Sequence, residues 1–166
     1  MQDAQFRPAV ADDVPAIVAF GDEVIPRHYS PIIGESAAQA QLDWWSPARF
    51  IEAINAGRVQ LATAGNQIVG VVETGEMAGE HVIWKLYVAP TVRGQGLGVK
   101  LIENAISSLP SETDYVLLEH FEGNSDAARF YEREGFEVTG IDVNDSNPSA
   151  SVVWRRRDLY PHAGKY

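Results

Sequence analysis

Three glycines stand at alternate positions, Gly94, Gly96 and Gly98, directly after Arg93 and directly before apolar residues at helical spacing. Glycine carries no Cβ, so a ligand can reach the backbone amides at the start of a helix without meeting a side chain. Those free amides and the positive end of the helix dipole favour an anion. The pattern R-x-x-G-x-G therefore predicts a cradle for two linked phosphates, and a turn that binds nothing is the alternative.

Two other phosphate-binding motifs do not match this segment. A dinucleotide-binding fingerprint needs glycine or alanine where Val99 stands, and an acidic residue at the end of a following strand, which is missing. A P-loop needs Gly-Lys followed by Ser or Thr, whereas Gly98 is followed by Val99, Lys100 and Leu101. Both motifs are therefore disfavoured.

The composition limits the class of protein. A length of 166 residues favours a single domain, 1–166, with an ordinary globular composition of 45% hydrophobic and 22% charged residues. The sequence shows no signal-peptide pattern and no apolar run long enough to span a membrane, so we expect a cytoplasmic protein without a membrane span. With no cysteine and four scattered histidines, it offers no thiolate nucleophile and no metal-ligand spacing. A net charge of −10 argues against nucleic acid and either confers solubility or suits a cationic acceptor.

Hydrophobic periodicity predicts a mixed α/β domain with a helical first part and alternating strands and helices after it. Ser46 before Pro47 predicts a helix start, Gly57 a helix end, and Pro110 the end of the helix that follows the glycines. The predicted helices span 11–25, 46–57, about 97–109 and 125–134. The predicted strands span 4–9, 58–64, 68–77, 81–89, 114–121, 136–142 and 149–159.

Two segments resemble the GNAT superfamily of N-acetyltransferases. Residues 86–102, LYVAPTVRGQGLGVKLI, resemble its acyl-CoA-binding segment, and residues 117–136, LLEHFEGNSDAARFYEREGF, resemble its following strand and helix. They stand in the family's order and cover about residues 81–137. The resemblance implies a central, mostly antiparallel twisted sheet of about six to seven strands flanked by about four helices. It also implies acetyl transfer from acetyl-CoA, as co-substrate, to a primary amine by direct attack in a ternary complex.

The resemblance assigns the acetyl-CoA contacts to three places. The backbone of the strand before the glycines pairs with the pantetheine arm and polarises the thioester carbonyl. The amides from Arg93 to Gly98 hold the pyrophosphate, and the second segment contributes its N-x-x-A element and a tyrosine. The acetyl-CoA-binding residues implied in this way are Leu86, Tyr87, Val88, Arg93, Gly94, Gln95, Gly96, Leu97, Gly98, Asn124, Ala127 and Tyr131.

Two of these residues have a structural interpretation as well. Asn124 contacts the pantetheine arm by resemblance, and its side chain also suits the N-cap of the helix that follows. Tyr131 matches the family tyrosine that donates a proton to the departing CoA thiolate. Gly135 and Phe136 alternatively predict a Schellman cap in which Tyr131 only packs.

The sequence does not settle which group takes a proton from the amine. Many members of the family place a glutamate early in the fourth strand, where Val82 stands here. We take Glu73 and His120 as the catalytic candidates. His81, Glu119 and a chain of water molecules are alternatives, and His28 is a weaker one.

The resemblance implies an acceptor pocket built from the first helices and the last strand loop, the parts that vary most in the family. Tyr29, Trp44 and Trp45 can form an aromatic wall for a cation, and Asp142 and Asp145 can attract it. Because adjacent helical positions cannot share a face, we expect at least one of the two tryptophans in the core.

Three acceptor hypotheses stay open. A small-molecule amine is the first, a protein N-terminus or lysine is the second, and an idle acyl-CoA-binding module without an acceptor is the third. The resemblance is compatible with a homodimer and implies neither a nucleic-acid partner, nor a membrane partner, nor a metal.

Overall fold

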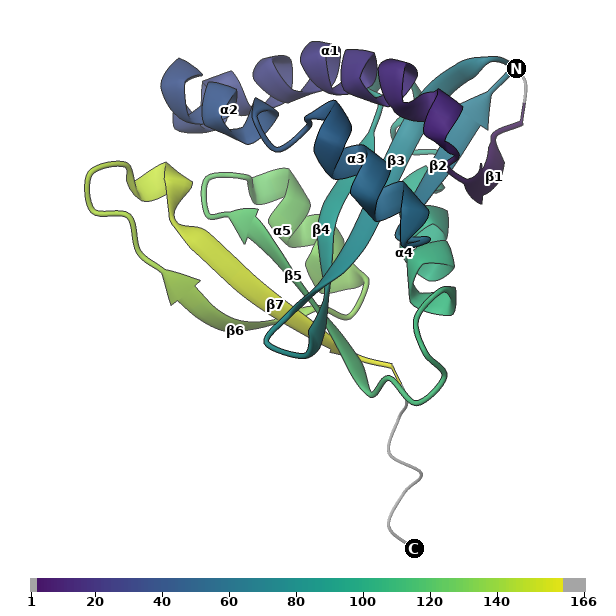
Figure 1. The fold of residues 1–166 in the computed structure, drawn as a ribbon. Coiled ribbons are helices and arrows are strands. Elements are labelled where there is room, and N and C mark those ends of the chain that lie inside the picture. The colour runs from purple at the N-terminus through teal and green to yellow at the C-terminus, as the bar shows by residue number, and fades with distance from the viewer. Residues whose placement is uncertain (1–2, 160–166) are drawn as a thin grey trace, which may run out of the picture.

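The computed structural model describes residues 3–159, which form the mixed α/β fold that the sequence predicts (Figure 1). The strands are β1 (Gln5–Pro8), β2 (Val59–Ala64), β3 (Gln67–Met77), β4 (Glu80–Val88), β5 (Tyr115–Phe121), β6 (Glu137–Asp142) and β7 (Val152–Asp158). The helices are α1 (Val14–Ile33), α2 (Glu35–Leu42), α3 (Pro47–Asn55), α4 (Leu97–Ser107) and α5 (Ser125–Arg133). None of the described helices is long and apolar enough to cross a membrane.

The sheet has the order β1-β2-β3-β4-β5-β7-β6, and every neighbouring pair is antiparallel except β4 and β5. These two parallel strands share only two register pairs, Val82 with Leu117 and Ile83 with Leu118. Beyond them the strands diverge, as Figure 1 shows. The sheet is therefore open at its centre, next to the carboxyl ends of β4 and β5.

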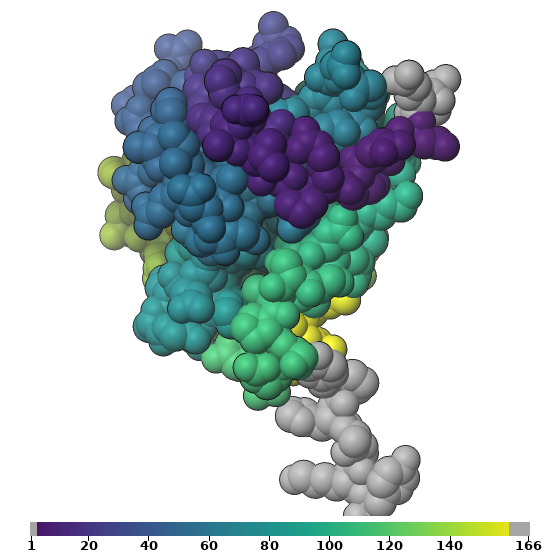
Figure 2. All heavy atoms as spheres, turned by 45° about the vertical axis from the view of Figure 1, so that its right-hand side comes forward, coloured from purple at the N-terminus to yellow at the C-terminus, as the bar shows by residue number. Residues whose placement is uncertain are grey.

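Hydrophobic side chains cover both faces of the sheet. On one face, Ile17 and Ile25 of α1 and Phe50 of α3 pack with Leu61 and Val71 of the sheet. On the other face, α4 and α5 pack against residues that include Ala62, Val72 and Leu118. Figure 2 shows the N-terminal segment with β1 lying against the α4 region, where Phe6 of β1 packs. Full burial of one such aliphatic side chain contributes about 1.5–3 kcal/mol, so both helical layers are held firmly to the sheet.

Helix α1 is longer than predicted, because it continues through Pro26 and Pro31 to Ile33. Each proline removes a helical hydrogen bond and normally costs about 3 kcal/mol inside a helix. Ile25, Tyr29 and Ile33 are buried at four-residue spacing across this part, so packing on the sheet compensates the loss. The predicted helix therefore ends at residue 25, whereas tertiary contacts keep residues 26–33 helical.

Helix α2 was not predicted, and it explains why the structure has five helices where about four were expected. Ala38 is its only buried residue, so it shows no apolar stripe that a periodicity analysis would detect. The cap predictions for α3 are confirmed. The Ser46 side chain accepts a hydrogen bond of 3.3 Å from the Arg49 amide, and Gly57 has φ 72° after the helix end.

Candidate active site

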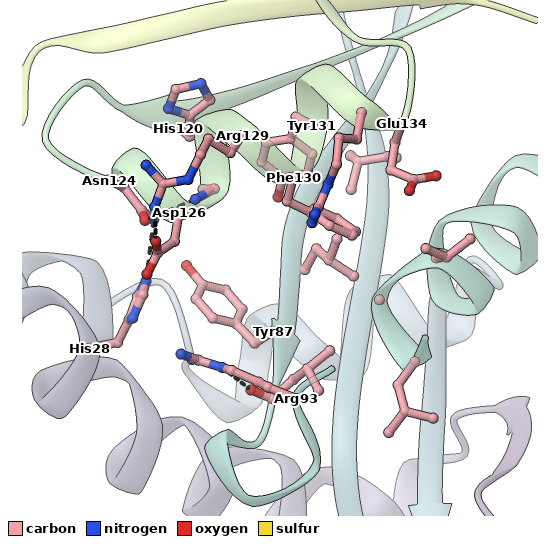
Figure 3. Close-up of a pocket in the computed structure, with 18 of the residues that line it drawn as sticks. His28, Tyr87, Arg93, His120, Asn124, Asp126, Arg129, Phe130, Tyr131 and Glu134 are labelled. Carbon is pink, nitrogen blue, oxygen red and sulfur yellow. Dashed lines mark hydrogen bonds and ion pairs between the residues drawn. The ribbon is translucent and has the colours of Figure 1, made fainter. Parts of the chain in front are cut away.

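A cleft of about 980 Å³ opens where β4 and β5 separate (Figure 3). Side chains from five parts of the chain surround it: α1, β4, the glycine loop, β5 and α5. In Figure 3, α1 is represented by His28, β4 by Tyr87 and the glycine loop by Arg93. The α5 part is represented by its N-cap Asn124 and by Tyr131. The divergence of two parallel strands thus brings together the two segments that the sequence singled out.

One edge of β4 is exposed to this cleft. Glu73 pairs with Lys85 and Thr74 with Ile83, so Trp84 is an extra, bulged residue in β4. The register pairs of β4 with β5 end at Ile83, and Leu86 and Val88 line the cleft beyond that point. A strand edge without a neighbour offers N–H and C=O groups to an added extended chain. The β4 edge can therefore bind a pantetheine-like arm by main-chain hydrogen bonds.

The glycine loop leads from this edge to α4. Gly94 and Gly96 have φ 80° and 78°, in the left-handed region that favours glycine, and a Cβ at either would meet no atom within 4 Å. Gly96 is the N-cap of α4 and, having no side chain, it cannot cap the first amides of the helix itself. The loop lines the cleft and fits a pair of linked phosphates.

Gly98 has a different reason to be glycine. It lies inside α4, and a Cβ there would come within 3.1 Å of the Phe130 ring of α5. Gly98 therefore allows the close approach of α4 and α5, in addition to lining the cleft. Of the three alternating glycines, two serve the backbone conformation of the loop and one serves helix packing.

Replacing Gly96 with alanine should weaken acetyl-CoA binding by at least about tenfold, because the Cβ obstructs the approach to the α4 amides. The left-handed backbone also costs about 1 kcal/mol of stability in this variant. Gly57→Ala is the matched control, since Gly57 has φ 72°, open surroundings and no contact with the cleft. Calorimetric titration should show weak binding for the first variant and wild-type binding for the second. Equal binding by both would contradict the assignment.

Asn124 makes two contacts at the start of α5. Its side-chain oxygen accepts a 3.3 Å hydrogen bond from the Ala127 amide, which confirms the predicted N-cap. Its Nδ2 lies 3.2 Å from Nε2 of His28 in α1. The amide nitrogen is the donor, so His28 accepts at Nε2. Burial lowers the pKa of His28, and Arg93 lowers it further. His28 therefore enters the cleft as a neutral ring that fixes Asn124.

Tyr131 occupies the predicted Schellman cap and the cleft at the same time. The Phe136 amide donates to the Tyr131 carbonyl at 2.9 Å, and the Gly135 amide donates to the Glu132 carbonyl at 3.1 Å. The Tyr131 side chain is buried against Phe136 and also lines the cleft. Burial raises its pKa well above the ordinary tyrosine value, so the phenol keeps its proton at neutral pH. The capping and catalytic interpretations are thus compatible.

The comparisons with known proteins match this geometry. The family model described as "Acetyltransferase (GNAT) domain" matches residues 55–138, just over half of the chain. The chain belongs to the GNAT acetyltransferase family.

One curated relative and two solved structures are similar to this chain. The peptidyl-lysine N-acetyltransferase YjaB of Salmonella typhimurium is 42% identical over 64 residues, 39% of this chain and 41% of the relative. The match thus spans about two fifths of the length of that curated relative. Two solved structures share the fold at 18% identity. The PaiA N-acetyltransferase of Thermoplasma acidophilum, in complex with coenzyme A, has a TM-score of 0.79 over 95% of this chain and 99% of its own. Ard1 of Thermoplasma volcanium has a TM-score of 0.74 over 95% of this chain and 99% of its own.

The two residues that we expected as the base of this GNAT domain are both engaged elsewhere. His120 accepts a 2.8 Å hydrogen bond from Arg155 Nε at its Nε2, and its Nδ1 lies 2.9 Å from the Phe121 carbonyl. Burial is the main cause that lowers the pKa of His120. Arg155 lowers this pKa further, and the contact with the Phe121 carbonyl raises it in part. Since Nε2 accepts from a guanidinium, the ring has no free lone pair for a substrate proton. These contacts do not support His120 as the base, although it lines the cleft and its ring stacks on Tyr131.

Glu73 is likewise engaged away from the cleft. Its Oε2 lies 3.0 Å from Nζ of Lys85, both side chains are less than 10% exposed, and neither lines the cleft. The alternative His81 faces Glu76 at 3.9 Å and also lies outside the cleft lining. The sequence could not show the Glu73 pairing, because Lys85 is brought opposite by the register of two strands.

Replacing Glu73 with glutamine should lower the free energy of unfolding by about 3 kcal/mol, because Lys85 loses its buried counter-charge. The activity per folded molecule should stay within about twofold of wild type, since no reacting group is removed. Denaturant titration and kcat measured on the folded fraction check both parts. Glu73→Leu combined with Lys85→Met should recover most of the stability. A large loss of kcat in a stable Glu73 variant would restore Glu73 as a base candidate.

Glu119 is the carboxylate that β5 places in the cleft, where Asp126, Glu132 and Glu134 of the α5 region also lie. It is half-buried on β5, and its pKa is raised by burial first and by Asp142 second. Along β5, Leu118 and His120 face α5, so Glu119 and Phe121 face the α1 side of the sheet. Glu119 and Tyr131 therefore reach the cleft from opposite faces. Sequence reasoning named Glu119 only as an alternative, and β5 alternation is the signal that separates it from His120.

The expected aromatic wall is only partly present. Tyr29 lines the cleft, and its hydroxyl lies 2.7 Å from the Tyr87 hydroxyl. Trp45 is buried in the core against Phe20, Phe50 and Tyr87, which corrects its assignment to the acceptor. Trp44 is exposed, lies under the Arg49 guanidinium, and is not part of the cleft lining. Neither tryptophan therefore contributes to this cleft.

Proposed function

We propose that this chain is an acetyl-CoA-dependent N-acetyltransferase whose acceptor is a primary amine, attacking directly in a ternary complex. One observation carries the proposal. The same cleft contains the unpaired β4 edge, the glycine loop at the start of α4, and Tyr131 on α5. These are the groups that a CoA thioester needs along its pantetheine arm, at its pyrophosphate and at its sulfur.

The residues divide the chemistry between the two faces of the sheet. Acetyl-CoA supplies the acetyl group as a thioester. Glu119 accepts a proton from the ammonium, since an amine with a pKa of about 10.4 is charged at neutral pH and must be deprotonated before attack. A β4 amide polarises the thioester carbonyl. The neutral amine nitrogen bonds to the carbonyl carbon, the carbon–sulfur bond breaks, and Tyr131 gives its proton to the sulfur. The nitrogen releases its second proton to solvent as the amide forms, and solvent returns a proton to Tyr131.

The gap between β4 and β5 determines how the two substrates meet. Tyr131 and the glycine loop lie on the α4 and α5 side, whereas Glu119 faces the α1 side. We therefore place acetyl-CoA on the first side and the amine on the second, with the reacting atoms in the gap. This arrangement supports direct transfer, because no nucleophilic residue has to carry the acetyl group.

The acceptor is a small-molecule amine in our first hypothesis and a protein N-terminus or lysine side chain in the second. The name of the curated relative, a peptidyl-lysine N-acetyltransferase, supports the second. Both acceptors are primary alkylamines, so Glu119 and Tyr131 would act in the same way on either. The idle-module hypothesis rested on Val82, and the presence of Glu119 in the cleft weakens it.

A thiol-release assay tests the function. The protein is mixed with acetyl-CoA and either alkylamines or lysine-containing peptides, free CoA is measured with a thiol reagent, and the acetylated amine is identified by mass spectrometry. We expect CoA release that depends on the amine, with one acetyl-amine formed per CoA. Acetyl-CoA binding without transfer to any amine would support the idle module instead.

A further inference from the structure

Two tryptophans and two carboxylates gather on the α1 side of the sheet, next to the gap. Glu119 of β5 stands directly opposite Trp154 of β7, and Trp154 stands opposite Gly140 of β6. Asp142 of β6 lies on the same face, and the Trp154 indole N–H donates to its Oδ2 at 3.1 Å. Trp84 of β4 completes the group, with its ring 6.2 Å from that of Trp154. Four strands thus contribute to one surface.

The bulge in β4 explains the position of Trp84. As the extra residue between Ile83 and Lys85, Trp84 is released from regular pairing, and bulges turn side chains in this way beside functional sites. Its ring meets Trp154 edge to face at 78°. Gly75 leaves room for it, because a Cβ there would lie 2.6 Å from Trp84 Nε1. Trp84 also lines the cleft, so this surface is continuous with the active site.

The surface is open to a ligand beside Trp154. A Cβ at Gly140 would meet no atom within 4 Å, so there is open space at the β6 position opposite Trp154. Asp142 is exposed, and Glu119 and the two indoles are half-buried. The guanidinium of Arg58, the nearby cation, is held on the Thr74 carbonyl at 2.9 Å. Indole faces bordered by carboxylates are a recognised environment for an ammonium group.

The reacting nitrogen is not the best occupant of such a site. It must become neutral before it attacks, and a site that holds its charge would stabilise the ground state more than the transition state. A positive group that stays charged throughout the reaction has no such disadvantage. The indoles and Asp142 therefore suit a second cation of the acceptor, while Glu119 faces the nitrogen that reacts.

We propose that Trp84, Trp154 and Asp142 form a subsite for a second positive charge, so that the acceptor class is primary alkylamines with another cationic group. This inference rests on the proposed function. An acceptor with a reacting amine and a second positive charge can be a free diamine or a lysine side chain next to a basic residue of a peptide. The subsite distinguishes such acceptors from amines of the same length with a single charge.

Matched acceptors test the subsite. Acetylation of 1,4-diaminobutane is compared with 1-aminobutane, and a blocked Lys-Arg dipeptide with a blocked Lys-Gln dipeptide. For the doubly charged member of at least one pair, kcat/KM should be at least about fivefold higher, after correction for two reactive amines in the diamine. The pair that shows the preference identifies the source of the acceptor. Equal kcat/KM within both pairs would overturn the inference while leaving the proposed function intact.

Matched variants assign the preference to these residues. Asp142→Asn and Trp154→Leu should each remove most of it, about three- to fivefold, measured as the ratio of kcat/KM between the two members of a pair. Asp145→Asn is the control, because it makes the same charge change at an exposed neighbour in the chain. Equal effects of Asp142→Asn and Asp145→Asn would mean that only net charge matters and would overturn the subsite.

A binding measurement separates failure of the subsite from failure of the proposed function. If no amine is acetylated, 1,4-diaminobutane and 1-aminobutane are titrated while the tryptophan fluorescence is recorded. Tighter binding of the diamine, lost in Asp142→Asn and kept in Asp145→Asn, would support the subsite even then. Equal binding of both amines would reject it.

Discussion

Replacing Tyr131 with phenylalanine is expected to lower kcat by at least about 100-fold, the usual contribution of a general acid. The phenol is buried at the cleft, and its raised pKa keeps it protonated, so it can give a proton to the leaving sulfur. The Schellman cap uses the backbone of Tyr131 and its ring contact with Phe136, and phenylalanine retains both. The fold and the affinity for acetyl-CoA should therefore stay close to wild type. Steady-state kinetics and acetyl-CoA titration measure the two effects.

Tyr115→Phe is the control for this experiment. Tyr115 carries a hydroxyl that donates to Glu80 at 2.6 Å, outside the cleft lining, so its loss should leave kcat unchanged. An unchanged kcat in Tyr131→Phe would limit Tyr131 to packing. A parallel fall in acetyl-CoA affinity would assign it to binding rather than to proton transfer.

Replacing Glu119 with glutamine should also lower kcat by about 100-fold or more, because the amine then loses the base that we propose on the α1 side of the gap. The wild-type pH profile carries a further signature. A base acts only when deprotonated, so kcat/KM falls as the pH drops through the pKa of Glu119. Burial and Asp142 raise that pKa above 4.5, so the acidic limb should lie above the pH range of an ordinary glutamate. Glutamine should remove this limb.

The control for Glu119 is Glu122→Gln, which removes one negative charge from an exposed position just beyond β5. This variant should keep both the rate and the acidic limb. If Glu119→Gln keeps the limb, another group or a chain of water molecules accepts the proton. An intact kcat in Glu119→Gln would have the same meaning.

The sequence predicted the glycine loop and α5 well because their roles depend on local backbone conformation. Gly96 needs a left-handed φ, Asn124 is an N-cap, and Gly135 ends α5, and each of these requirements can be read from a short stretch of chain. The strand boundaries were predicted for the same reason, since alternation is a local property. The fold class and the local conformation of these two segments were thus accessible without coordinates.

The base and the acceptor residues were not accessible in this way, because their roles depend on partners far along the chain. Glu73 is neutralised by Lys85 across a strand pair, and His120 is occupied by Arg155 of β7. Trp45 fills a core space beside Gly21 of α1, where a Cβ would come within 2.5 Å of the indole. Trp84, which the sequence analysis did not consider, acquires its position from a bulge that only the register reveals.

A thermal-melt titration with acetyl-CoA, with ATP and NAD as controls, tests the central claim most directly. Binding at 100 times the dissociation constant adds about 2.7 kcal/mol to the stability of the folded chain. In a domain of this size we expect a rise in melting temperature of roughly 5–10 °C with acetyl-CoA and none with the controls. No rise with acetyl-CoA, or an equal rise with ATP or NAD, would contradict the assignment of the cleft to a CoA thioester.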